Sequence, residues 1–284
     1  MVENKLIKKQ PFASKTAILC GGSQGMGKEI GKAIIQLGGS VCIIARTLNT
    51  LQDAAKEMKD LISGENQFVE IINCDTTDMD KLKPLLTEFI NKHGVPDYLF
   101  NMVGYAIVQY IEKLTLSDFK KNMDTNYYGQ LVPMLILLPY FMKEKKGYFI
   151  NFSSMLGYFG IMGYATYAPS KFAIVGLVEA MRNELVPYNI NFSIVYPPDV
   201  DTPGFEKENI TKPEECAIIS EGGGLLSAKD AADVIIKGVL KKKLNILPGR
   251  AKIIWRLFRI FPNLVRNVID KDYLKARKQL GKSI

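Results

Sequence analysis

Tyr167 and Lys171 are four residues apart in the segment Tyr-Ala-Pro-Ser-Lys, at the start of an apolar stretch that runs to about Leu185. On a helix, side chains with this spacing lie on one face, so the phenol and the ammonium group can meet. A phenol with its ordinary pKa of about 10 is a poor acid–base catalyst at neutral pH, and a nearby cation lowers that pKa. The pair could therefore exchange a proton with a substrate oxygen, although the same spacing also occurs between ordinary surface residues.

Other polar residues stand where short apolar runs end. Ser154 follows one run, Asn101 and Gly104 end another, and Asn126 lies in the segment Met-Asp-Thr-Asn-Tyr-Tyr-Gly. If the runs are strands of an open parallel sheet, their carboxyl ends meet at one edge, where ligands bind. We expect these residues to lie near Tyr167 at that edge.

A glycine-rich turn follows the first apolar run and precedes an amphipathic segment. It reads Gly21-Gly-Ser23-Gln24-Gly25-Met-Gly27. Glycines allow a tight turn and a close approach of the backbone, and the free N–H groups of the helix that follows bind an anion. The pattern at this position predicts a cradle for the pyrophosphate of a dinucleotide.

The same turn also matches Gly-x-Ser-x-Gly, the nucleophile motif of α/β-hydrolases. That motif follows a central strand, whereas this one follows the first, and the only histidine available as a base is His93. We therefore favour the dinucleotide cradle. A single histidine and the absence of paired cysteines also make a metal site unexpected.

The residue after the second apolar run indicates which dinucleotide binds. Arg46 occupies this position. In dinucleotide-binding proteins an acidic residue here binds the free 2′-hydroxyl of the adenine ribose, whereas a basic residue suits a 2′-phosphate. This favours NADP(H) over NAD(H); a solvated arginine at the end of a strand is the alternative.

Seven short apolar runs alternate with amphipathic stretches along the first 250 residues. Strands that are apolar throughout and separated by helices imply a parallel sheet covered on both faces. We expect an α/β, doubly wound (Rossmann) seven-stranded sheet in a single domain, residues 1–250. The runs are residues 16–20, 40–45, 68–73, 98–101, 148–152, 191–196 and 244–247.

Two segments depart from this alternation. Residues 131–142 are strongly apolar but too short to cross a membrane, and they are expected to form a core or subunit-contact helix. Residues 197–226 form a long connection with four prolines, which is typical of a substrate lid.

The composition is that of a globular protein, with 47% hydrophobic and 23% charged residues. Three of the four cysteines lie in apolar runs and none is paired by spacing, which favours buried thiols and a reducing compartment. No signal peptide is recognised at the start of the chain.

The net charge of +8 is confined to the last residues. Residues 249–284 carry ten Lys and Arg against two Asp, so the rest of the chain is neutral. Residues 251–284 therefore form a basic amphipathic tail, expected to be helical, with bulky apolar residues around Trp255. Such a helix suits the surface of an anionic membrane, and packing on the protein itself is the alternative. The aliphatic stripe argues against nucleic acid as a partner.

With the glycine turn, Asn126, Ser154 and Tyr167–Lys171 together, residues 14–250 resemble the short-chain dehydrogenase/reductase family. The resemblance implies that Tyr167 protonates a ketone oxygen, that Lys171 lowers the pKa of the phenol and contacts the nicotinamide ribose, and that Ser154 polarises the carbonyl. It implies that Asn126 holds a water in a proton relay.

The resemblance also implies a set of residues for the cofactor. Asp75 would contact the adenine, Asn101 and Gly104 would line the cofactor cleft, and Thr202 would meet the carboxamide. Two departures are modest, since Cys20 replaces a usual threonine and Asn101-Met-Val-Gly104 replaces Asn-Asn-Ala-Gly.

Within that family, residues 195–215 are similar to the 3-ketodihydrosphingosine reductases, with Pro197-Pro198 where most members have Pro-Gly. This implies reduction of a long-chain keto lipid by NADPH, at the cytosolic face of the endoplasmic reticulum or otherwise in the cytoplasm. A reductase of steroids, retinoids or 3-ketoacyl lipids and a non-catalytic NADPH-binding scaffold are the alternatives. Family precedent implies a homodimer or homotetramer through the helices at about 116–145 and 163–186.

Overall fold

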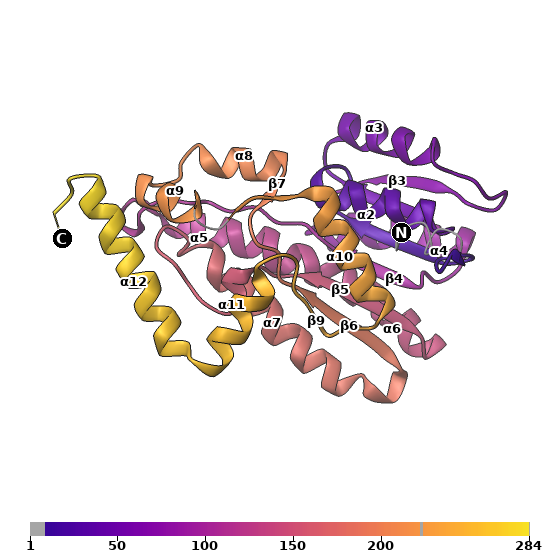
Figure 1. Ribbon diagram of the computed structural model, residues 1–284. Coiled ribbons are helices and arrows are strands. Elements are labelled where there is room, and N and C mark those ends of the chain that lie inside the picture. Colours follow the sequence, from indigo (N-terminus) through magenta and orange to yellow (C-terminus); the bar gives the residue numbers. More distant parts are fainter. Residues whose placement is uncertain (1–8, 222–223, 284) are drawn as a thin grey trace.

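A parallel sheet of seven strands forms the centre of the protein (Figure 1). The computed structural model describes residues 9–221 and 224–283. The strand order is β3-β2-β1-β4-β5-β6-β9, and every neighbouring pair is parallel. The expectation of a doubly wound, seven-stranded fold is confirmed, and each apolar run of the sequence forms one strand. The strands are β1 (Thr16–Cys20), β2 (Ser40–Ala45), β3 (Val69–Asn73), β4 (Tyr98–Asn101), β5 (Gly147–Phe152), β6 (Ile190–Val195) and β9 (Asn245–Ile246).

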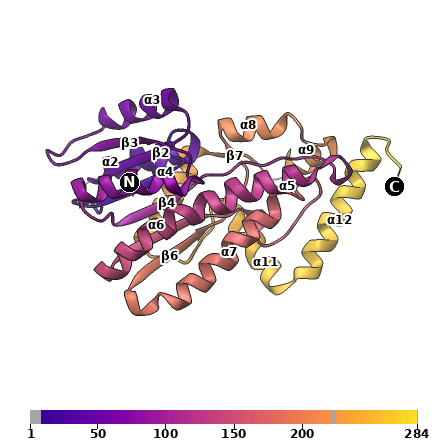
Figure 2. The same ribbon diagram turned by 180° about the vertical axis from the view of Figure 1, so that it is seen from behind.

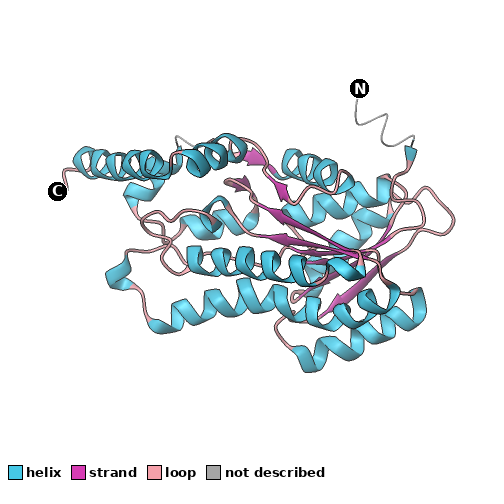
Figure 3. Ribbon diagram, turned by 90° about the horizontal axis from the view of Figure 1, so that it is seen from below, coloured by secondary structure: helices cyan, strands magenta, loops and turns pink. Residues whose placement is uncertain are grey.

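Helices cover both faces of the sheet (Figure 3). One face packs against α2 (Gly25–Gln36), α3 (Leu48–Lys59) and α10 (Ala228–Leu240). The other packs against α4 (Met79–His93), α6 (Gly129–Glu144) and α7 (Tyr167–Glu184). The short helix α5 (Leu116–Met123) leads into α6 through a π-helical turn, Asp124–Tyr128.

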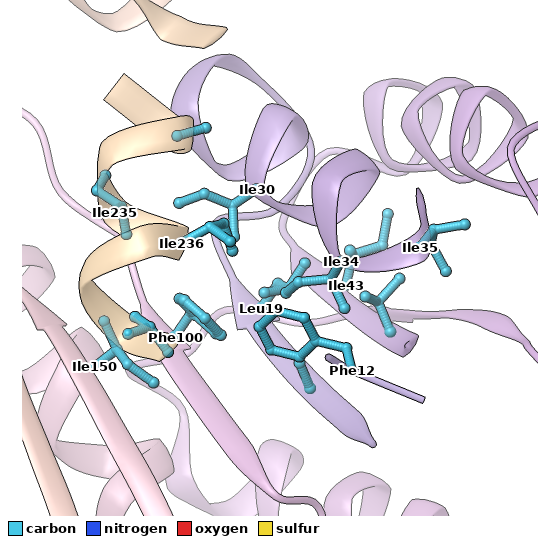
Figure 4. Packing of buried hydrophobic residues seen from close by; sticks show 14 of the residues in the cluster. Phe12, Leu19, Ile30, Ile34, Ile35, Ile43, Phe100, Ile150, Ile235 and Ile236 are labelled. Atoms are coloured by element: carbon cyan, nitrogen blue, oxygen red, sulfur yellow. The ribbon is translucent and has the colours of Figure 1, made fainter. Parts of the chain in front are cut away.

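Alternation along the strands explains why both faces are apolar. Leu19 of β1 faces α2 and α10, where it packs near Ile34 (Figure 4), whereas Ile18 belongs to the opposite core. Both residues are fully buried. Successive side chains of a strand point to opposite faces, so a strand buried on both sides must be apolar throughout. This is why the runs could be recognised as strands.

The strand order reverses between β1 and β4, because β2 and β3 lie on one side of β1 and β4 to β9 on the other. At such a switch point the loops that follow the two strands diverge and leave a crevice at their carboxyl ends. The glycine turn after β1 and Asn101 at the end of β4 both border it.

The lid segment, residues 197–226, contains regular structure that the sequence did not reveal. It forms α8 (Pro203–Asn209) and α9 (Glu214–Glu221), and β7 (Val200–Asp201) pairs with β8 (Leu226–Ser227) in a separate two-stranded sheet. Thr202 caps α8 by accepting a hydrogen bond from the Phe205 amide at 3.2 Å.

The tail forms two helices, α11 (Ala251–Ile260) and α12 (Pro262–Gln279). Figures 1 and 2 show α12 beside α9 of the lid. Lys282 Nζ donates to Tyr110 Oη at 3.0 Å and to Glu215 Oε2 at 3.1 Å, and Glu215 is fully buried. The tail is thus packed on the body of the protein, which was one of the two alternatives.

All four cysteines are buried free thiols. Within the described residues, no helix is both long and apolar enough to span a bilayer.

Candidate active site

A cavity of about 520 Å³ lies at the carboxyl ends of the strands, between the sheet, the lid segment and the tail. Ser154, Tyr167 and Lys171 line it, as does Gly104 from the loop after β4. The structure therefore brings together, from β5, α7 and the β4 loop, residues that are far apart in the sequence. Apolar side chains make up most of the remaining wall.

Tyr167 and Lys171 converge as their spacing on α7 predicts. Lys171 Nζ lies 5.4 Å from the centre of the Tyr167 ring and donates a hydrogen bond to the Phe152 carbonyl at 2.9 Å. The Ser154 hydroxyl, two residues beyond β5, lies close enough to the Tyr167 phenol to lower its pKa. A substrate oxygen placed between Ser154 and Tyr167 would meet two hydroxyl groups.

The end of β5 holds α7 in place. The Ser153 hydroxyl donates to the Lys171 carbonyl at 2.9 Å, and Gly157 leaves room for this contact, since a Cβ there would lie 2.0 Å from Ser153 Oγ. Ser154 Oγ accepts a hydrogen bond from the Leu156 amide at 3.2 Å, which fixes its rotamer. Both serines of this strand end thus have defined positions, and only Ser154 faces Tyr167.

Burial sets the protonation states of the pair. It lowers the pKa of Lys171, which is 4% exposed, to about 7. Burial also raises the pKa of Tyr167, as do the negative charges of Glu208 and Asp199, while the hydrogen bond with Ser154 acts in the opposite direction. At neutral pH the phenol is therefore protonated, which is the state that a proton donor for ketone reduction needs.

Asn126 lies in the π-helical turn before α6 and is fully buried. Its Oδ1 accepts from the Tyr105 amide at 2.9 Å, and its Nδ2 donates to the Tyr105 carbonyl at 3.0 Å and to Ser170 Oγ at 2.9 Å. Gly104 lies between Asn126 and Lys171. A Cβ at this position would be 3.0 Å from Lys171 Nζ and 3.1 Å from Asn126 Oδ1, so only glycine fits there without a shift. Asn126 thus fixes the loop beside Lys171.

The turn after β1 fits a pyrophosphate. Gly21 and Gly25 have φ of 87° and 52°, which favour glycine, and a Cβ at Gly27 would lie 2.2 Å from the Gly21 carbonyl oxygen. Gln24 stands at the N-cap of α2 without a side-chain cap, and Ser23 lies beside it in the turn. The backbone amides of the first helical turn are therefore left for a bound anion.

Asn101 provides a second indication of a ligand at this edge. It is fully buried, and neither Nδ2 nor Oδ1 has a hydrogen-bond partner among the described residues. An unpaired buried amide costs about 1–3 kcal/mol, so a polar ligand that pairs with it would recover that cost. This fits a cofactor in the crevice between β1 and β4.

The remaining cofactor candidates surround this crevice. Arg46 Nη1 lies 3.6 Å from Asp75 Oδ2 at the ends of β2 and β3. Asp75 also accepts from the Thr77 amide at 2.9 Å, which holds its carboxylate in place. On the lid side, Thr202 lies against the glycine turn, since its Cγ2 is 2.8 Å from the position of a Cβ on Gly25.

Two parts of this cavity could not be predicted from the sequence. The tail lines one wall with apolar side chains of α11 and α12, among them Ile254, Leu257 and Val268. The lid contributes Asp199 and Glu208. The amphipathic pattern of the tail was visible but could not show what its apolar side covers, and no local signal distinguishes Glu208 from the exposed Glu206.

Comparison of the sequence with known proteins identifies the family of this chain. A family model described as short chain dehydrogenase matches residues 15–213. The chain belongs to the short-chain dehydrogenase family. It is 36% identical to a 3-ketodihydrosphingosine reductase of Dictyostelium discoideum, covering 79% of this chain and 72% of the relative. It is 34% identical to a 3-dehydrosphinganine reductase of Danio rerio, over 83% of this chain and 72% of the relative.

Solved structures of short-chain dehydrogenases have a similar fold. A short-chain type dehydrogenase/reductase from Mycobacterium marinum superposes with a TM-score of 0.75 at 23% identity, covering 84% of this chain and 95% of the other. Like other short-chain dehydrogenases, this protein is an oxidoreductase that acts on a carbonyl or alcohol group with a nicotinamide dinucleotide. The cradle and the orphaned amide of Asn101 suit that cofactor.

Replacing Arg46 with alanine should reduce the preference for NADPH over NADH by about 10- to 100-fold, because a charge-assisted contact with the 2′-phosphate would be lost. The measurement is kcat/KM for each cofactor at saturating ketone. Lys59→Ala, which removes a cation at the end of α3, serves as the control. Equal losses with both cofactors would refute a role of Arg46 toward the phosphate.

Proposed function

We propose that this protein reduces 3-ketodihydrosphingosine to dihydrosphingosine with NADPH. Two relatives above 30% identity carry the names of enzymes of this reaction, and each is matched over most of both chains. The similarity of residues 195–215 to this subgroup lies in the lid segment, which lines the cavity. It therefore bears on the substrate more directly than the cofactor motifs do.

The lining of the cavity is the observation that supports a lipid best. Its wall holds Tyr167 together with apolar side chains of the body, such as Leu156 and Phe159, and of the tail, such as Leu257 and Val268. A volume of about 520 Å³ suits a ligand with tens of heavy atoms. A mostly apolar wall that includes a proton donor fits a ketone on a long alkyl chain.

We assign the roles of the residues from this placement. The cofactor, when bound, supplies the hydride that reduces the ketone carbon. Tyr167 donates its phenolic proton to the ketone oxygen, and Ser154 donates a hydrogen bond to the same oxygen. Lys171 stabilises the phenolate that Tyr167 becomes, and Asn126 holds the adjoining loop and the hydroxyl of Ser170 in position.

A substrate panel tests the assignment. With NADPH, kcat/KM for 3-ketodihydrosphingosine should exceed that for a ketosteroid, retinal and a 3-ketoacyl thioester by at least tenfold. A higher kcat/KM for any of the other three would assign the protein to a different branch of its family. Binding of NADPH without turnover of any ketone would point to the scaffold alternative.

We also propose that the tail contacts an anionic membrane, at the cytosolic face of the endoplasmic reticulum. The exposed surface of α11 mixes the cations Lys252 and Arg256 with Ile253 and Ile260, which are 63% and 66% exposed. Each cation near an anionic surface contributes about 1 kcal/mol, and buried apolar side chains contribute more. Because the same helices line the cavity, a lipid could pass from the membrane to Tyr167.

The double variant Ile253→Asp/Ile260→Asp should bind vesicles with 30% phosphatidylserine at least tenfold more weakly than the wild type, since it removes two apolar contacts and adds repulsion. Co-sedimentation measures it. Neither side chain lines the cavity, so NADPH binding should not change. Val186→Asp alters an equally exposed residue outside the tail and serves as the control; vesicle binding that resists the double substitution would contradict the membrane contact.

We propose further that the protein is a homodimer or homotetramer through α6 and α7. Each of these helices carries a large apolar side chain that is exposed in the monomer, Leu135 on α6 and Phe172 on α7, both at 45%. Such residues gain stability when a second subunit covers them. Sedimentation equilibrium of the wild type and of Phe172→Glu would test this assembly.

A further inference from the structure

Two carboxylates face the same cavity as the catalytic phenol. Asp199 lies just before β7, and Glu208 lies on α8 with 16% of its side chain exposed. Most other residues of this wall are apolar. Carboxylates in such surroundings lose hydration, so their presence requires a compensating partner.

Glu208 is linked directly to the tyrosine pair. The Tyr164 hydroxyl donates a short hydrogen bond to Glu208 Oε1, and the Tyr164 ring packs edge-on against Tyr167 with 6.0 Å between ring centres. The charges of Glu208 and Asp199 are close enough to raise the pKa of the Tyr167 phenol. The two carboxylates therefore influence the electrostatic potential at the position where the ketone would be reduced.

The protein neutralises only part of this negative charge. Lys212 Nζ lies 3.3 Å from Glu208 Oε1 and 4.5 Å from the centre of the Phe205 ring, with 4% of its side chain exposed. Burial raises the pKa of both carboxyl groups, and the charge of Lys212 acts in the opposite direction on each. One lysine for two carboxyl groups leaves an excess of acidic groups on the lid side of the cavity. The other charged residues of the wall are Lys171 on α7, Arg250 before α11 and Asp272 on α12.

Negative charge on Glu208 and Asp199 acts at the Tyr167 phenol and there opposes ketone reduction, because the carbonyl oxygen gains negative charge as the hydride arrives. Charges of like sign at short distance repel more strongly in a partly buried site than in water. A cation carried by the substrate beside its ketone would remove this penalty and would itself be held by the carboxylates. The charge of the site therefore matches a ketone with an adjacent positive group.

We propose that Glu208, supported by Asp199, binds a primary ammonium group on the carbon next to the substrate ketone, and so selects 2-amino ketones over plain long-chain ketones. This inference rests on the proposed function, since 3-ketodihydrosphingosine carries an amino group at that carbon. It adds a specificity determinant in the lid, apart from the residues that transfer the proton.

The test compares two ketones of equal chain length, 3-ketodihydrosphingosine and its analogue without the amino group, 1-hydroxyoctadecan-3-one. Each is assayed with NADPH and the wild type, Glu208→Gln or Glu206→Gln. Glutamine keeps an acceptor for the Tyr164 hydroxyl and removes the charge. Glu206→Gln makes the same change on the exposed side of α8.

For Glu208→Gln we expect kcat/KM to fall about 30- to 300-fold with the amino ketone, as for a buried charge pair that loses one partner. The deaminated ketone should be reduced at least as well as by the wild type, and Glu206→Gln should behave like the wild type with both. Equal losses on the two ketones would assign Glu208 a purely structural role, and unchanged kinetics would remove it from the site. Either result would overturn the inference.

The wild type separates this inference from the proposed function. If it reduces neither ketone, or only the deaminated one, the proposed function fails. If it prefers the amino ketone and Glu208→Gln keeps that preference, the inference fails alone. Should Glu208→Gln not fold, as judged by NADPH binding, Asp199→Asn must show the same selective loss, and inhibition by dihydrosphingosine must weaken in that variant.

Discussion

Replacing Tyr167 with phenylalanine should lower kcat for ketone reduction by about 10²–10⁴-fold, which is the usual contribution of a positioned general acid. The substitution removes the phenolic oxygen and leaves the ring against Tyr164. The raised pKa of Tyr167 keeps the phenol protonated at neutral pH, so it holds the proton that the ketone oxygen needs. Single-turnover oxidation of NADPH measures the loss.

Binding of NADPH to Tyr167→Phe should be nearly unchanged, because the cradle at Gly21–Gly27 and Arg46 is intact. Tyr158→Phe is a suitable control. Its hydroxyl makes only a 3.5 Å contact with the Ala251 carbonyl, and its residue does not line the cavity. If Tyr167→Phe reduced the ketone at the rate of the wild type, the proton would have to come from another group.

Replacing Lys171 with methionine should also lower kcat by about 10²–10⁴-fold, since the phenolate formed by Tyr167 loses its neighbouring cation. The same change should stabilise the protein. Burial lowers the pKa of Lys171 from 10.5 to about 7, which corresponds to at most about 5 kcal/mol of destabilisation when the group is charged. With the lost hydrogen bond to Phe152 subtracted, we expect a gain of about 2–4 kcal/mol at pH 6.

The gain should depend on pH. Between pH 7 and 10.5 the unfolded chain binds a proton that the folded protein does not bind at Lys171, so the free energy of unfolding of the wild type rises with pH. The advantage of Lys171→Met should therefore be about 2–3 kcal/mol smaller at pH 9 than at pH 6. Urea unfolding of both proteins at the two pH values measures this difference. An advantage that is equal at both pH values would mean that Lys171 keeps an ordinary pKa.

The strands could be predicted from the sequence because the fold buries each of them on both faces. The run Thr16–Cys20, for example, is apolar at four of its five positions, and those four residues are buried in the strand. The lid was harder, since α8 and α9 are short and owe their positions to Thr202 and to the buried Glu215. In the tail, hydrophobic periodicity predicted an amphipathic helix. It did not show that one helix ends before Pro262 and a second begins there. Nor did it show that apolar side chains of both helices line the cavity.

Some residues of the candidate site could likewise be predicted from the sequence and others could not. Tyr167, Lys171 and Ser154 could be predicted from their spacing and from the position of strand ends, which parallel topology brings to one edge. Glu208 was not, because its contact with Tyr164 joins residues 44 positions apart through the fold of the lid. The contacts of Asn126 with Tyr105 and Ser170 likewise depend on a π-helical turn that no sequence pattern announced.

The reaction of the purified full chain with NADPH and 3-ketodihydrosphingosine in mixed micelles, followed by mass spectrometry of the lipid, tests the proposed reaction most directly. We expect one dihydrosphingosine for each NADPH oxidised, with deuterium from 4-deuterated NADPH found on the carbinol carbon. Unchanged 3-ketodihydrosphingosine, with NADPH bound but not oxidised, would contradict it.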